Sequence, residues 1–191
     1  MKTVAGLILA AGRASRMGSD KRLARIGGHS MLELAMAAAM GAGLDPVVVV
    51  VSGPEPLAPM PRGISVVINP EPSRGMASSL VTGVEALPDS VAGVAVLLAD
   101  MPRVEARHLL LLLAQAGPDR ICVPVHQGRR GNPVVLGRTF FPDLLALTGD
   151  RGAKGILARH SQAVREVEMP DESVLMDVDT PEELRAAGGE P

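Results

Sequence analysis

Five consecutive valines, Val47–Val51, constrain the fold of this chain more than any other stretch of its sequence. β-branched residues favour extended backbone, and a strand without polar positions has to be buried on both of its faces. A second apolar run, Val4–Leu9, indicates another strand of this kind. Such strands occur in parallel sheets that are covered by helices on each face. The sequence therefore predicts a mostly parallel sheet between two layers of helices.

Segments with strand composition alternate with segments rich in helix formers throughout the sequence. The expected strands are Val4–Leu9, Val47–Val51, Ile64–Ile68, Val91–Ala99, Ile121–Val125, Pro133–Leu136, Ala163–Val167 and Val174–Val178. The expected helices are Ser30–Ala42, Arg74–Leu87, Val104–Ala116, Phe140–Leu147, Ala153–His160 and a capped helix that begins at Thr180. We expect an α/β protein with a three-layer, Rossmann-like fold. We assign residues 1–187 to a single domain and expect residues 188–191 to form a flexible tail.

Composition limits the functions open to this chain. Its 191 residues are 47% hydrophobic and 21% charged, which is typical of one globular domain with a large core. A formal net charge of −2, with no Trp and no Tyr, argues against a nucleic-acid partner. No apolar run reaches the roughly 18 residues that cross a bilayer, and no signal-peptide pattern occurs, so we expect a cytoplasmic protein without membrane contact. Cys122 lies in an apolar run and is expected to be an inert core thiol.

The strand Val4–Leu9 leads into a loop of small residues and cations. Ala10, Ala11 and Gly12 leave backbone N–H groups open to a ligand. The nearby cations are Arg13, Arg16, Lys21, Arg22 and Arg25. Bare N–H groups and fixed positive charge suit a phosphate group, although a surface loop with solvated arginines is the alternative. The loop matches neither the Walker pattern nor the dinucleotide fingerprint, which disfavours a P-loop ATPase and a nicotinamide-dependent reductase.

Polar residues also follow other expected strands, at the sheet edge where α/β proteins bind ligands. Asn69 follows one strand, and Asp100 follows the apolar strand Val91–Ala99. Asp100 either binds Mg²⁺, which prefers one or two carboxylates together with phosphate oxygens and water, or caps the next helix. A second metal-binding carboxylate would come from Asp177 or Asp179, and the other member of this pair can simply cap the final helix.

Several sequence blocks occur together in a characteristic order. They are Leu9-Ala-Ala-Gly-x-x-x-Arg-Met-Gly-x-x-Lys21, Arg74-Gly-Met-Ala-Ser-Ser-Leu80, Leu98-Ala-Asp-Met-Pro102, Arg130-Gly-Asn-Pro133, Gly149-Asp-Arg-Gly-Ala153 and Asp177-Val-Asp-Thr-Pro-Glu182. In these blocks the chain resembles the nucleotidyltransferases that load molybdopterin with a nucleotide, and it looks most similar to the cytidylyltransferase branch. The resemblance covers nearly the whole chain. It implies a nucleotidyltransferase fold, CTP and molybdopterin (molybdenum cofactor) as substrates, and Mg²⁺ as cofactor. A target molybdoenzyme is a further expected partner.

The resemblance also implies roles for individual residues. Arg16 and Lys21 are expected to bind the β- and γ-phosphates, because negative charge accumulates on the departing pyrophosphate. The expected catalytic residues are Arg16, Lys21 and Asp100, and the expected metal ligands are Asp100 with Asp177 or Asp179. The expected nucleotide-binding residues are Leu9, Ala10, Ala11, Gly12, Lys21, Asn69, Gly75, Ser78 and Ser79. For Gly75, Ser78 and Ser79, which begin a helix, ordinary capping is the alternative role.

Two features bear on which substrates are used. Ala11 and the block Met76–Ser79 differ from the guanylyltransferase pattern and favour cytidine as the base. Asn132 stands where the family more usually has His, in a turn expected near the acceptor, and Asp150 and Arg151 either border the acceptor or are solvated loop charges. The other functions left open are transfer from GTP, a phosphosugar or other small phosphate acceptor, and a non-catalytic carrier or chaperone of molybdenum cofactor.

Overall fold

The structure is a computed structural model that describes residues 3–11, 24–53, 60–149 and 152–190. Within these residues, eight strands form one mixed sheet in the order β10-β7-β9-β6-β1-β4-β5, with β8 paired to β7. The strands are β1 (Val4–Leu9), β4 (Val47–Val51), β5 (Ile64–Ile68), β6 (Gly93–Leu98), β7 (Ile121–His126), β8 (Arg129–Arg130), β9 (Val134–Gly137) and β10 (Val164–Glu168). Strand β1 runs parallel to β4 and β6, and only β8 and β9 of this sheet run against the other strands. The predicted mostly parallel sheet is confirmed.

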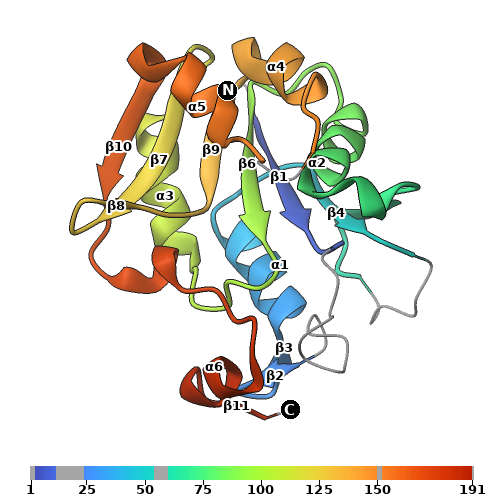
Figure 1. The fold of residues 1–191 in the computed structure, drawn as a ribbon, viewed down its shortest axis with the longest axis vertical. Coiled ribbons are helices and arrows are strands. Elements are labelled where there is room, and N and C mark those ends of the chain that lie inside the picture. Colours follow the sequence, from blue (N-terminus) through green and yellow to red (C-terminus); the bar gives the residue numbers. More distant parts are fainter. Residues whose placement is uncertain (1–2, 12–23, 54–59, 150–151, 191) are drawn as a thin grey trace.

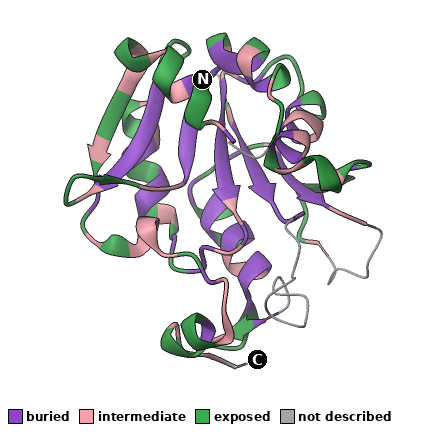
Figure 2. Cartoon of the chain, viewed as in Figure 1, coloured by how far each residue is buried: buried purple, intermediate pink, exposed green. Residues whose placement is uncertain are grey.

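Helices cover both faces of this sheet, as the valine run requires. The helices in the described residues are α1 (Met31–Gly41), α2 (Met76–Glu85), α3 (Ala106–Gln115), α4 (Phe141–Leu145), α5 (Lys154–Arg159) and α6 (Pro181–Ala186). Val47, Val49 and Val51 pack with buried residues of α1 and α3. Val48 and Val50 face the opposite layer, which contains buried residues of α2, α4 and α5. The central strands are accordingly buried, whereas β5 and β10 at the two edges are largely accessible (Figure 2).

A second, smaller sheet lies beyond the carboxyl ends of β1 and β6, beside α6 (Figure 1). In the described chain it consists of β2 (Arg25–Ile26), β3 (His29–Ser30) and β11 (Gly189–Glu190) in the order β11-β2-β3. Residues expected to form a flexible tail thus include a strand, because Gly189 and Glu190 pair with β2. A small apolar cluster that contains Met31 and Leu184 lies beneath this sheet.

Capping boxes fix where two helices begin. At α1 the Ser30 hydroxyl accepts a hydrogen bond from the Glu33 N–H (3.2 Å), and the Ser30 N–H donates to the Glu33 carboxylate (2.6 Å). At α6 Thr180 and Glu183 make the same reciprocal pair. Each box satisfies backbone N–H groups that have no partner within the helix.

One expectation about local structure is corrected, and one helix shows a clear division between its faces. Val174–Val178 was expected to be a strand, but residues Glu172–Leu175 form a short 3-10 helix and the rest of that segment pairs with no strand of the described sheets. The reason is that the Asp171 carboxylate accepts the Ser173 N–H (3.0 Å) and starts a helical turn. In α3, Leu109 and Leu112 are buried, whereas Leu110 and Leu111 are exposed, because only one face of this helix meets the sheet.

Among the residues that the structure describes, no helix is long and apolar enough to cross a membrane.

Gly83 provides a test of the contact between α2 and the sheet. A methyl group on this residue would collide with the Leu7 side chain and lie 2.9 Å from a Val50 methyl carbon. Because both neighbours are fully buried, we expect Gly83→Ala to lower the free energy of unfolding by about 1–3 kcal/mol in urea denaturation. Gly155→Ala on α5 is the matched control, since its methyl group would meet no atom within 4 Å. Equal stability of the two variants would contradict the close packing of α2.

Candidate active site

The carboxyl ends of β1, β4, β5 and β6 form one edge of the sheet, and backbone hydrogen bonds continue past the strand ends. The Ala10 N–H donates to the Val50 carbonyl (2.8 Å), and the Ala99 N–H donates to the Leu9 carbonyl (3.1 Å). The Asn69 N–H donates to the carbonyl of Val51 (2.8 Å). From this edge the chain leaves β1 toward β4 on one side and leaves β6 toward β7 on the other. The space between such diverging connections is where doubly wound sheets bind ligands.

The small residues at the end of β1 present backbone rather than side chains to this edge. Leu9, Ala10 and Ala11 are buried. Leu9 packs into the layer of α2, and Ala10 packs into the layer of α1 and α3. The Ala10 N–H, which was expected to be open to a ligand, is instead bound to the Val50 carbonyl. Gly12, Arg16 and Lys21, the other expected phosphate-binding residues, lie outside the described residues.

Asn69 joins the end of β5 to the start of α2. Its side chain is 1% exposed, and Nδ2 donates to the hydroxyls of Ser78 (2.8 Å) and Ser79 (2.9 Å). Its Oδ1 accepts the N–H of Glu71 (2.9 Å). Gly75 precedes helix α2 as its N-cap residue and has no side chain to cap it, so this buried amide fastens the first turn instead. The side chain expected to touch a nucleotide is thus engaged by protein.

The first turn of α2 is also occupied by protein partners. The Ser78 hydroxyl lies 2.8 Å from the Gly75 carbonyl and 3.0 Å from that of Glu71. The Ala77 N–H donates to the Gly149 carbonyl (3.1 Å). The hydroxyl contacts brace the turn but do not cap it, because in the described chain the Ser78 and Ser79 hydroxyls accept no hydrogen bond from a backbone N–H group at the start of α2. Gly75 has a φ of 88° and no side chain. No side chain of Gly75 itself therefore stands between the backbone of this turn and a ligand.

The glycine-flanked turn that contains Asp150 and Arg151 meets α2 through its flanking residues. Gly149 bonds to Ala77, and a methyl group on Gly152 would lie 2.9 Å from the Met76 sulfur. Both flanking glycines therefore lie next to the block Met76–Ser79, which the resemblance links to the choice of base. Asp150 and Arg151 themselves are outside the described residues.

Asp100 lies at the end of β6, half-buried, and the segment that carries Asp177 and Asp179 is bound next to it. The Val178 N–H donates to the Asp100 carbonyl (2.8 Å), so both flanking aspartates enter this edge from one short segment. Neither of them caps α6, because Thr180 does so. The Asp179 N–H donates to the Glu183 carboxylate (2.8 Å). Within the described residues, no group of three or more His, Cys, Asp or Glu side chains is assembled to hold a metal ion.

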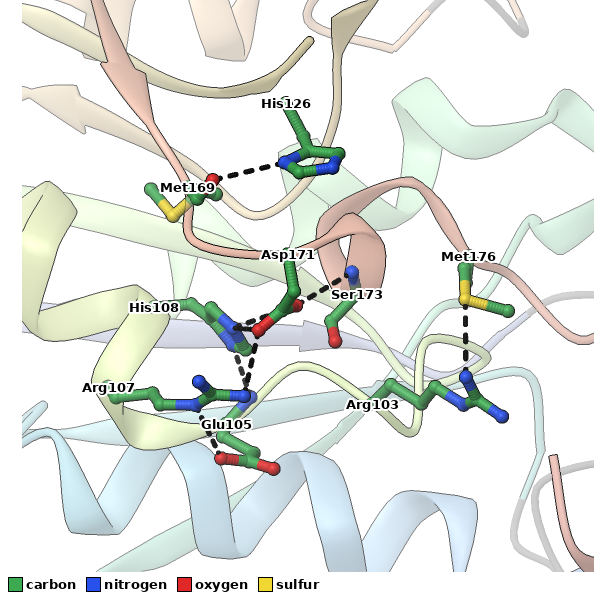
Figure 3. A network of polar contacts seen from close by, with 9 residues as sticks. All are labelled: Arg103, Glu105, Arg107, His108, His126, Met169, Asp171, Ser173 and Met176. Atoms are coloured by element: carbon green, nitrogen blue, oxygen red, sulfur yellow. Dashed lines mark hydrogen bonds and ion pairs between the residues drawn. The ribbon is translucent and has the colours of Figure 1, made fainter.

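Residues 169–178, here called the strap, follow β10 and reach Asp100 through the Val178 N–H. Figure 3 shows Met169, Asp171, Ser173 and Met176 of the strap. His126 Nδ1 lies 3.1 Å from the Met169 carbonyl, to which it donates a hydrogen bond. The Asn132 N–H donates to the Val174 carbonyl (2.9 Å), and Arg103 Nη1 lies 3.6 Å from the Met176 sulfur. The strap thus joins the ends of β6 and β7 to the turn before β9.

A buried histidine in α3 holds the strap, and sequence reasoning missed it. His108 is 0% exposed; its Nδ1 accepts the Glu105 N–H (3.0 Å), which leaves Nε2 to carry the ring proton toward Asp171. Hydrogen bonds from Ser173 and the proximity of His108 hold the pKa of Asp171 well below its usual range. The available signal was the spacing Glu105-x-x-His108 at a helix start, which is a capping pattern with an unusual residue.

Removal of the Asn69 amide tests the anchor of α2. Asn69→Ala would remove the N–H donor that two hydroxyls share and the oxygen that accepts the Glu71 N–H. We therefore expect the free energy of unfolding to fall by about 2–3 kcal/mol in urea denaturation. Ser65→Ala, at an exposed position of neighbouring β5, is the control and should change it by less than about 0.5 kcal/mol. A small effect of Asn69→Ala would mean that the amide does not fasten the helix.

Comparison with known proteins agrees with this geometry. Residues 6–164 match the family described as the MobA-like NTP transferase domain. The chain is 31% identical to the purine catabolism protein PucB of Bacillus subtilis (strain 168), over 93% of this chain and 92% of PucB. It is similar to the crystal structure of Rv0371c from Mycobacterium tuberculosis H37Rv, with a TM-score of 0.86, 26% identity and 97% of each chain covered. It is also similar to the complex of Rv0371c with manganese, with a TM-score of 0.79, 25% identity and 98% of each chain covered. The chain belongs to the MobA-like NTP transferase family, and its fold is that of a nucleotidyltransferase.

Proposed function

We propose that this nucleotidyltransferase transfers CMP from CTP to the phosphate of molybdopterin and releases pyrophosphate. One observation carries the proposal: the Val178–Asp100 backbone hydrogen bond brings an aspartate-bearing segment beside Asp100, between the diverging connections of β1 and β6. This edge offers peptide groups from β1 and the start of α2 on one side, and the strap with the turn at Asn132 on the other. The first side suits the nucleotide, and the second suits the acceptor.

The reaction requires positioning and charge neutralisation more than acid–base chemistry. A phosphate oxygen of the acceptor attacks the α-phosphorus of CTP, the bond from that phosphorus to the bridging oxygen of the β-phosphate breaks, and pyrophosphate takes up the electron pair. The attacking phosphate is already ionised at neutral pH, so no strong base is needed. Arg16 and Lys21 are proposed to hold the β- and γ-phosphates, where negative charge grows.

The residues at this edge fit a magnesium ion. Mg²⁺ uses one or two carboxylates and completes its coordination with phosphate oxygens and water, so the lack of a larger ligand cluster in the described residues is expected. Asp100 would hold it with Asp177 or Asp179, since Thr180 relieves both from capping α6. When bound, the ion would neutralise phosphate charge and orient the triphosphate. The solved complex of Rv0371c with manganese supports a divalent cation in this family.

Cytidine is proposed as the base because of the residues at two places, Ala11 and the turn Met76–Ser79. Ala11 is buried at the end of β1, and Ala77 is buried in the first turn of α2. The sequence of this turn, Met76–Ser79, differs from the guanylyltransferase pattern, as does Ala11. We therefore place the base near α2 and propose that CTP is preferred to GTP.

The product identifies donor and acceptor in one measurement. Purified protein incubated with molybdopterin, Mg²⁺ and each nucleoside triphosphate in turn should yield molybdopterin cytosine dinucleotide by mass spectrometry, together with pyrophosphate. In competition, an excess of GTP should not displace CTP from the reaction. A guanine dinucleotide as the main product would overturn the choice of base, and no dinucleotide from any triphosphate would overturn the choice of acceptor.

Substitution of Asp100 tests the metal assignment. Asp100→Ala should lower turnover by at least about 100-fold, because the protein would no longer hold the Mg²⁺ that neutralises charge on the triphosphate. Asp119→Ala, an exposed aspartate before β7, is the control and should leave turnover unchanged. Parallel assays of Asp177→Asn and Asp179→Asn identify the second ligand as the one with the larger loss. Normal turnover of Asp100→Ala would remove Asp100 from the proposed site.

A further inference from the structure

The strap is fastened to α3 by charged and buried groups that the proposed chemistry does not use. His108 Nε2 lies 3.4 Å from both carboxylate oxygens of Asp171, and Arg107 Nη2 lies 2.9 Å from Oδ2 (Figure 3). Arg107 is itself bound to the Glu105 carboxylate (2.8 Å). A histidine with no exposed surface cannot shift without disturbing α3, so it gives Asp171 a rigid support.

From Asp171 the strap continues to the turn at Asn132 and then to Asp100. Its Val174 carbonyl accepts the Asn132 N–H (2.9 Å), and a methyl group on neighbouring Gly131 would collide with that same carbonyl oxygen. Four residues later, Val178 bonds to the carbonyl of Asp100 (2.8 Å). A shift of Asp171 would therefore move the segment that contacts both the turn at Asn132 and the proposed metal ligands.

We infer that Asp171, held by His108 and Arg107, is a positioning residue that sets the geometry of the acceptor side of the site. It touches no substrate and acts through the strap. This inference rests on the proposed function, because it takes the turn at Asn132 to contact the phosphate-bearing acceptor. A displacement of reacting groups by about 1 Å can reduce a rate by about 100-fold, so a loosened strap has a measurable kinetic effect.

The nucleotide side is fastened separately. In the described chain, the side-chain hydrogen bonds of Asn69 and Ser78 go to one another and to Glu71, Gly75 and Ser79, and none of them reaches the strap. Loss of Asp171 should therefore affect the acceptor and the proposed metal ligands, and leave the contacts at the start of α2 unaffected. This asymmetry separates positioning from general destabilisation.

A matched control lies at the opposite edge of the sheet. Asp143 in α4 also lies between a histidine and an arginine, since its carboxylate is 3.0 Å from His160 Nε2 and also binds Arg159. We expect Asp171→Asn to raise the acceptor KM by about 10-fold or more, while the Kd for CTP measured without Mg²⁺, which reports only the contacts of the nucleotide with protein, stays unchanged. Asp143→Asn should leave both constants unchanged even where it lowers the melting temperature. Equal acceptor KM values for Asp171→Asn and wild type, or an equal rise in both variants, would overturn the inference.

Backbone amide exchange tests the same inference without any substrate. In Asp171→Asn the amides of Asn132 and Val178 should exchange faster than in the wild type, and the Asn69 amide should not. Arg107→Gln, at a half-exposed position, retains the His108 contact and should give a smaller acceleration at the same two amides, which covers the case in which Asp171→Asn fails to fold. Unchanged exchange at Asn132 and Val178 would refute the positioning role. A wild-type protein that makes no dinucleotide would refute the proposed function alone.

Discussion

The hydrogen-bond ladder on both sides of β1 is the constraint on which the rest of this structure depends. Because β1 is paired in parallel with β4 and β6, and the pairing continues to Ala10 and Ala99, the strand ends are held level with one another. Polar side chains are absent from the central strands β1, β4 and β6, and every valine of β4 is buried. Asp100 follows the last residue of β6, and Asn69 follows the last residue of β5.

The two sides of the candidate site are held by different physical means. A neutral buried amide, Asn69, fastens the side next to α2, where hydrogen bonds to hydroxyls and a peptide N–H are satisfied without charge. A carboxylate between two basic side chains, Asp171, fastens the strap. Amide hydrogen bonds change little with salt, whereas the exposed ion pair with Arg107 is screened by it. The two sides therefore respond differently to ionic strength.

The fold could be predicted from sequence because apolar runs such as Val47–Val51 have one stable environment, a sheet covered on both faces. The edge position of Asn69 and Asp100 followed from the same argument. Their contacts did not, since the partners of Asn69 are nine and ten residues away and obey no periodicity. Within the strap, Val174–Val178 was expected to be a strand because four of its five residues are apolar, but the bond from the Ser173 N–H to Asp171 outweighs that preference. Nothing in the sequence pairs Asp171 with His108.

The small sheet has a consequence for the order in which the protein is made. Strand β2, which begins shortly after the proposed phosphate loop, pairs with Gly189 and Glu190, and Ala24 and Met31 pack with Leu184. A chain emerging from the ribosome can pair β1 with β4 and β6 long before residues 184–190 exist. The pairing of β2 with β11 must therefore wait until residues 184–190 have been made. A nascent chain would pair its central strands before β2, next to the proposed phosphate loop, has its partner β11.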